Sequence, residues 1–161
     1  MTLFNIPDLF ARLLPEERLI GLDPGQRQVG VALTDVRRRV ASPYATLRRG
    51  KLSVMAAEIR AIADKEGAGG LVVGLPLSLD GSFGPAAQAS RDWTIALSDM
   101  TGLPAANWDE RLSSSAVNRA LIQEADMTRT RRQEVVDRAA AAYMLQGVLD
   151  FVSYQEEYRQ F

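Results

Sequence analysis

The sequence predicts a single α/β domain built on a mixed five-stranded sheet with helices on both faces. Three observations support this prediction. Three strand-like segments open the chain, strand and helix patterns alternate after them, and hydrophobic residues make up 47% of the 161 residues, which is enough for a substantial core. We expect the domain to span residues 18–152, after an N-terminal extension at 1–17 and before a C-terminal tail at 153–161.

The opening strands follow from short apolar runs and a turn signal. Residues 18–23 are a short run, apolar between Arg18 and Asp23, that ends at Asp23-Pro-Gly, which favours a tight turn. Residues 28–34 read as a second strand, so the two form a hairpin. Residues 40–47 form a weaker third strand, and Pro43 places it at an edge or in an irregular position.

The alternating part begins with a helix at 52–66, which Gly67 ends. Residues 70–74 are a strand that is apolar on both faces, as in the interior of a covered sheet. A loop at 75–84 precedes a helix that starts with Pro85 and ends at Gly102. This helix carries Ala89, Trp93, Ala96, Leu97 and Met100 on one face.

The remaining elements are a strand at 104–108, a helix after the N-cap candidates 113–115, a polar connection at 127–133 and an Ala-rich helix at 134–151. The first ten residues lack the basic leading region of a signal peptide, and no apolar run is long enough to span a membrane. We expect the Leu and Phe side chains of this start to dock on the domain or on a partner.

Composition excludes several kinds of active site. The chain has neither Cys nor His, which rules out disulfides, thiolate metal sites, His-ligated zinc and a Ser-His-Asp triad. Acid–base chemistry must then come from carboxylates, Lys, Tyr or metal-bound water. The absence of Cys fits a reducing cytoplasm.

Three acidic residues stand at the edges of predicted elements: Asp23, Glu110 and Asp137. Carboxylates brought together from distant segments repel one another, and a divalent cation removes that repulsion. If the three converge, they can hold one or two Mg²⁺ or Mn²⁺ ions in a phosphodiester-cutting enzyme. Asp137 shares a helix face with Ala141 and Met144, so it points towards the sheet.

Each acid also has a structural interpretation. Asp23 suits a turn before Pro-Gly. Glu110 can pair with Arg111, and Asp109 is its rival because strand alternation directs one of the two towards the site and the other away. Asp137 favours the first turn of a helix or pairs with an Arg.

Basic residues are concentrated locally although the net charge is −1. One stretch, residues 36–57, contains six basic residues and no acidic one: Arg37, Arg38, Arg39, Arg48, Arg49 and Lys51. A second contains Arg129, Arg131 and Arg132. These stretches either bind phosphates, in which case binding weakens as salt rises, or form solvated surface.

The acidic positions lie in segments that, in this order and spacing, make the chain resemble the YqgF family over residues 18–151. That family contains RNase H-like proteins described as Holliday junction resolvases and as pre-16S rRNA nucleases. The matching segments are Gly21-Leu-Asp-Pro-Gly25, Val29-Gly-Val-Ala-Leu-Thr-Asp35, Ala41-Ser-Pro43, Val72-Val-Gly-Leu-Pro-Leu77, Asp80-Gly-Ser82 with Gly84-Pro85 and Gln88, Asp109-Glu-Arg-Leu112, and Val136-Asp137 with Ala140, Ala141 and Leu145-Gln-Gly147.

The resemblance implies an RNase H-like fold, a Mg²⁺ or Mn²⁺ cofactor, and a cytoplasmic nuclease that processes the 5′ end of pre-16S rRNA during ribosome biogenesis. It assigns the catalytic and metal-binding roles to Asp23, Glu110 and Asp137. Candidate nucleic-acid contacts are Arg27, Ser78, Ser82, Arg111, Arg131 and Arg132. The partners expected are pre-16S rRNA, branched DNA or a ribosomal precursor particle, with the chain a monomer or weak homodimer.

Three alternatives stay open. Cleavage of branched DNA requires paired active sites and favours an obligate symmetric dimer. An ATP-dependent phosphotransferase of the actin-like superfamily shares the first hairpin but needs a second domain. A non-catalytic RNA-binding assembly factor needs none of the three acids.

Overall fold

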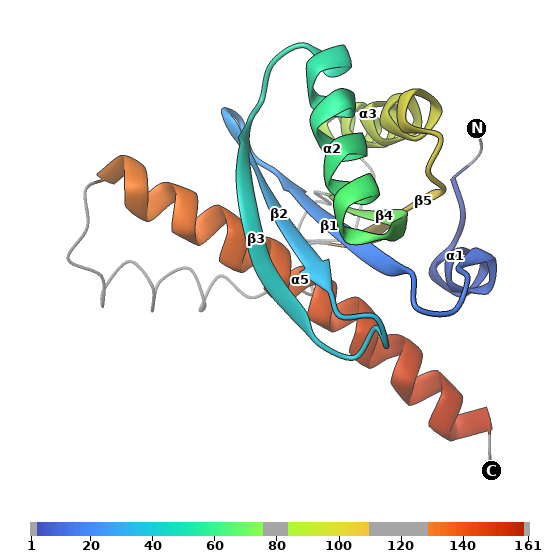
Figure 1. Cartoon of the computed structure of the whole chain (residues 1–161). Helices are drawn as coiled ribbons and strands as arrows, with labels where there is room; N and C mark the ends of the chain where they lie inside the picture. Colours follow the sequence, from blue (N-terminus) through green and yellow to red (C-terminus); the bar gives the residue numbers. More distant parts are fainter. Residues whose placement is uncertain (1–2, 76–83, 110–128, 160–161) are drawn as a thin grey trace.

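The computed structural model describes residues 3–75, 84–109 and 129–159, and within the last helix it describes the side chains of residues 134–156. Its centre is a five-stranded sheet in the order β3-β2-β1-β4-β5 (Figure 1). The strands are β1 (Arg18–Pro24), β2 (Gln28–Thr34), β3 (Ala41–Arg48), β4 (Ala68–Leu75) and β5 (Ala105–Asp109).

The pairing of the strands confirms the predicted mixed sheet. Strand β2 pairs antiparallel with both β1 and β3, whereas β1, β4 and β5 run parallel. The carboxyl ends of β1, β4 and β5 therefore meet at the same edge of the sheet. Strand β3 lies at the edge, as Pro43 predicted, and its register shifts beside this proline.

Helices cover both faces of the sheet (Figure 1). Helices α2 (Leu52–Glu66) and α3 (Pro85–Thr101) lie on one face, and α5 (Arg129–Arg159) crosses the other. Alternate residues of each strand enter different cores. Ile20 and Leu22 of β1 pack with α2 and α3, while Leu19 packs with α5.

The N-terminal segment docks on the α5 side of the domain. Helix α1 (Ile6–Arg12) buries Ile6 and Leu9 in the same core as Leu145 and Val148 of α5. The backbone amide of Phe4 also donates to the carbonyl of Ala105 in β5, at 3.0 Å. The sequence left open whether this segment docks on the domain or on a partner. The structure shows it docked on the domain.

The face predicted for α3 was only partly right. Leu97 is buried and Trp93 packs partly buried against the core, whereas Ala89 and Met100 are exposed. The other buried side chains of α3 are small or hydroxyl-bearing: Ala87, Ser90, Thr94, Ser98 and Thr101. Their hydroxyls donate to nearby backbone carbonyls, for example Thr94 to Ser90 at 2.8 Å. A helix can bury such residues because the local hydrogen bond offsets the cost of burying the hydroxyl.

The polar connection predicted at 127–133 was also wrong over its described part. Helix α5 begins at Arg129 and continues to Arg159, beyond the predicted range of 134–151. Arg and Gln are good helix formers, so a polar sequence at a helix end does not stop the helix. The helix expected after residues 113–115 lies outside the described residues.

Side-chain hydrogen bonds fasten the β2–β3 hairpin to α5. The Oε1 of Gln146 accepts from the amide of Ala41 at 2.9 Å, and its Nε2 donates to the carbonyl of Arg39 at 3.0 Å. The Asp35 carboxylate closes the turn by accepting the amides of Val40 and Arg39. These hydrogen bonds hold the pKa of Asp35 below its ordinary value.

Helix α5 lies very close to the sheet at Gly30 of β2. A Cβ atom at Gly30 would overlap the backbone carbonyl of Asp137 in α5. Glycine inside a strand usually marks a close approach of another backbone, and here that backbone is the helix. The absence of a side chain at position 30 therefore sets the depth at which α5 lies on the sheet.

We expect Gly30→Ala to lower the free energy of unfolding by about 1–3 kcal/mol, because the new methyl group must displace α5. Urea unfolding measures this change. Gly50→Ala is the matched control, since a Cβ at Gly50 meets no atom within 4 Å, and its effect should stay within about 0.5 kcal/mol. Equal effects of the two substitutions would contradict the close contact.

Candidate metal-binding site

Asp23 lies on the face of the sheet that α5 covers. It is directly opposite Gly30 in the antiparallel pair of β1 and β2, and opposite residues project from the same face. Two residues earlier, a Cβ at Gly21 would lie 3.0 Å from the Cβ of Leu145 in α5. Asp23 is half-buried at the carboxyl end of β1, the end where sites in such sheets form.

Asp137 joins Asp23 through the contact of α5 with Gly30. Its backbone carbonyl lies against Gly30, which is the cross-strand partner of Asp23. The same helix side buries Ala141, Met144 and Val148, as the spacing predicted. Asp137 is half-buried, and its backbone lies over the strand partner of Asp23, on the side of the sheet that carries Asp23.

This arrangement suits a hard divalent cation. Both candidate ligands are carboxylates, which Mg²⁺ and Mn²⁺ prefer, and neither is fully buried, so water can complete the coordination. Within the described ranges no three acidic side chains gather into one cluster. The third predicted ligand, Glu110, lies outside the described residues.

Asp109 belongs to the opposite face of the sheet. In β5, the Nδ2 of Asn107 donates to the Oγ1 of Thr94 in α3 at 3.0 Å, whereas the ring of Trp108 packs 5.5 Å from that of Phe151 in α5. Strand alternation then places Asp109 with Asn107 on the α3 side. By this alternation Asp109 and Asp23 lie on opposite faces of the sheet, and the choice between Asp109 and Glu110 stays a prediction.

The turn that follows Asp23 is held from the other face by Arg49. The Nη1 of Arg49 donates to the carbonyl of Gly25 at 2.6 Å, and its backbone amide donates to the carbonyl of Arg27 at 2.9 Å. Its guanidinium lies 5.3 Å from the ring centroid of Trp93 in α3, within cation–π range. Arg49, from the basic stretch, thus positions the turn.

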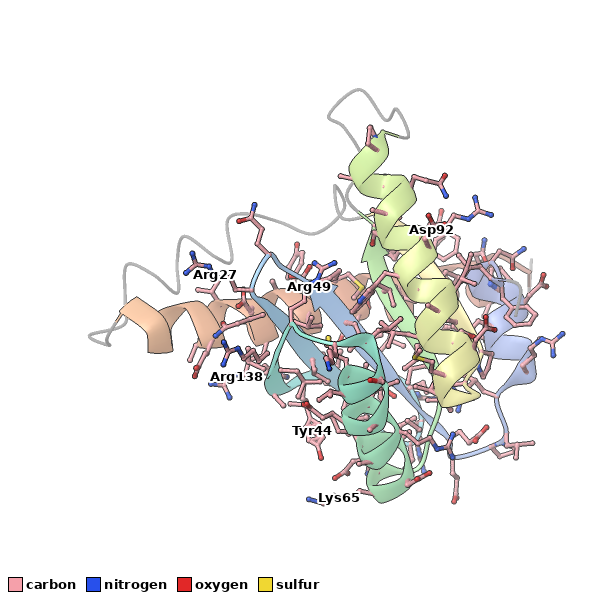
Figure 2. All side chains as sticks on the ribbon, turned by 90° about the horizontal axis from the view of Figure 1, so that it is seen from above. Arg27, Tyr44, Arg49, Lys65, Asp92 and Arg138 are labelled. Atoms are coloured by element: carbon pink, nitrogen blue, oxygen red, sulfur yellow. The ribbon has the colours of Figure 1, made fainter. Side chains whose placement is uncertain are left out.

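The predicted nucleic-acid contacts are only partly described. Arg27 is exposed at the tip of the β1–β2 turn, beside α5 in Figure 2. Ser78, Ser82 and Arg111 lie outside the described residues, and so do the side chains of Arg131 and Arg132, whose backbone belongs to α5.

Sequence reasoning missed the roles of Gly30, Arg49 and Trp93. A glycine flanked by Val29 and Val31 in a strand was a usable signal, because it indicates a close backbone approach. No comparable signal marks the contact between Arg49 and Trp93, which joins residues that are distant in the sequence.

We expect Arg49→Ala to speed hydrogen exchange at the Gly25 amide, which donates to the carbonyl of Gln28 at 2.8 Å across this turn. NMR-detected exchange measures the effect. Arg48→Ala, one residue away and outside these contacts, is the control and should leave that amide unchanged. An unchanged Gly25 exchange rate in Arg49→Ala would show that Arg49 does not hold the turn.

A solved structure with a related fold is the yeast mitochondrial Holliday junction resolvase Ydc2. It is similar over 97% of this chain and 88% of its own, with a TM-score of 0.52 and 9% sequence identity. At this identity the likeness concerns the fold alone, and it agrees with the RNase H-like fold expected from the sequence.

Sequence comparison identifies the family. A relative from Gluconacetobacter diazotrophicus, named "Putative pre-16S rRNA nuclease", is 69% identical over 93% of this chain and 97% of its own. A relative of the same name from Acidiphilium cryptum is 61% identical over 95% of this chain and 96% of its own. The family model described as "RuvX: Holliday junction resolvase" matches residues 17–151, so the chain belongs to the RuvX/YqgF family.

Proposed function

We propose that the chain is a divalent-metal-dependent nuclease that processes the 5′ end of pre-16S rRNA in the cytoplasm. The observation that supports the proposal is the contact of α5 with Gly30, where the backbone of Asp137 lies over the strand partner of Asp23 near the carboxyl end of β1. Close relatives named for pre-16S rRNA support the choice of substrate.

We assign the metal to Asp23 and Asp137, with Glu110 as a third ligand on the evidence of the Asp109-Glu-Arg-Leu112 motif alone. A Mg²⁺ or Mn²⁺ ion bound there would act as a Lewis acid on the phosphate and favour deprotonation of the attacking water. The chain has no His to serve as a general base. Activation of the attacking water by a metal would supply that function.

The chain's own residues supply position and charge. β1 and its turn hold Asp23 at the sheet edge, and Arg49 fixes the turn from the opposite face. Arg27 is exposed in the turn between β1 and β2, where a guanidinium can form a charge-assisted hydrogen bond to a phosphate oxygen.

The description of the matching family favours a second substrate, branched DNA. Cutting a four-way junction symmetrically needs two active sites in a two-fold dimer. We retain pre-16S rRNA as the first choice because the relatives above 60% identity carry that name over nearly their whole length.

We expect the wild-type protein to cut a labelled 5′ segment of pre-16S rRNA when Mg²⁺ or Mn²⁺ is present. Asp23→Asn and Asp137→Asn should each lower the rate by more than about a hundredfold, because a metal site supplies several kcal/mol of transition-state stabilisation. Gel analysis of the products under single-turnover conditions measures the rates.

Asp92→Asn is the matched control, because Asp92 is an exposed carboxylate on α3 that accepts a hydrogen bond from Gln88 of the same helix (Figure 2). Its rate should equal that of the wild type. Equal cutting by all four proteins would overturn the carboxylate site. Cutting confined to a four-way DNA junction would assign the second substrate, and RNA binding without cutting would indicate an assembly factor.

A further inference from the structure

We propose that a groove between α5 and the adjoining ends of β2 and β3 binds the phosphate backbone of the RNA strand that enters the carboxylate site. The inference rests on the proposed function and extends it to a surface that contacts the substrate. The groove has a volume of about 410 Å³ and is lined by Arg27, Gln28, Thr46, Leu47, Arg48 and Glu134.

The strand ends that line the groove lie on the same face of the sheet as Asp23. Gly30 is opposite Thr46, and the next pair on that face is Gln28 and Arg48. The Oγ1 of Thr46 donates to the carbonyl of Glu134 in α5 at 2.8 Å, which fixes the helix above this strand end. Asp23, Gly30 and Thr46 form one row of cross-strand partners, and Gln28 and Arg48 form the next row on that face. The two rows are two residues apart along the strand, roughly 7 Å.

The cations of the groove are available to a ligand. Arg27 and Arg48 are exposed, and neither forms an ion pair with a carboxylate in the described part of the chain. This differs from Arg18 and Arg60, which are paired with Glu66 and Asp64. Two guanidinium groups without carboxylate partners, beside one acidic side chain, give the groove a net positive charge.

The wall of the groove contains an unsatisfied polar atom. The Oε1 of Gln28 is buried and lacks a hydrogen-bond partner within the described residues. Unpaired buried polar atoms are uncommon and often mark a position that is completed by solvent or a ligand. Gln28, which lines the groove, therefore has a polar atom that no described residue satisfies.

A nucleic-acid strand is the occupant that fits. Its phosphates are spaced regularly, so one phosphate at the carboxylate pair brings its neighbour towards Arg48. Phosphate contacts fix the position of a strand without reading its sequence. The groove is therefore expected to orient the strand, and the opposing charge of Glu134 limits how tightly it does so.

Fluorescence anisotropy tests the proposal with a labelled RNA hairpin that carries a single-stranded 5′ tail, in EDTA and in the Asp23→Asn background to prevent cutting. Arg27→Ala and Arg48→Ala should each weaken binding roughly tenfold and lower the salt slope by about 1. Glu134→Gln should tighten binding, because it removes the negative charge and keeps the shape of the side chain.

Arg37→Ala is the matched control, since Arg37 is exposed in the turn at the opposite end of β2, and it should bind like its parent. Unchanged RNA affinity in both groove variants, or an equal loss in Arg37→Ala, would overturn the proposal. So would a loss confined to a four-way DNA junction measured alongside.

The experiments distinguish failure of the groove proposal from failure of the proposed nuclease function. If the groove variants lose RNA affinity while the wild type fails to cut, the groove stands and the nuclease function falls. If the wild type cuts and the groove variants bind and cut at its rate, the nuclease function stands and the groove falls.

Discussion

The approach of α5 to Gly30 is the contact on which the site depends. Asp23 and Asp137 are 114 residues apart in the sequence, and they become neighbours because Asp137 lies over the strand partner of Asp23. A side chain at position 30 would hold the helix away from the sheet. Gln146 fastens the same helix to the β2–β3 hairpin, so the carboxylate pair rests on regular elements that are fixed at more than one point.

The two faces of the sheet have different roles. The α5 face holds the carboxylates and the basic groove, and the α2–α3 face supports the turn after Asp23 through Arg49 and Trp93. The basic stretch recognised in the sequence is divided in the same way. Arg49 holds the turn and Arg38 donates to backbone carbonyls before β1, whereas Arg48 faces the groove. Charge density in a sequence therefore did not reveal which cations are available for phosphate.

Most of the fold could be predicted because its signals are local. Apolar runs, the Asp-Pro-Gly turn and the glycine caps at Gly67 and Gly102 identified the strands and the helix ends. The full buried face of α3 could not be predicted from the sequence. Ser90 and Thr94 are polar residues, and their burial depends on hydrogen bonds that form only in the folded helix. Asp23 and Asp137 were chosen from their places in strand and helix, but how they lie relative to one another depends on the tertiary contact at Gly30. The glycine in the strand signals a close backbone approach but does not identify α5 as the element that approaches.

The most direct test of the account is anomalous diffraction from crystals of the wild-type protein soaked in Mn²⁺. The account predicts an anomalous peak at the carboxyl end of β1, with oxygen atoms of both Asp23 and Asp137 at roughly 2.1–2.2 Å, close to the distance expected for a hard divalent cation. A peak elsewhere, or one bound by only one of these two carboxylates, would contradict the claim that α5 and β1 together build the metal site.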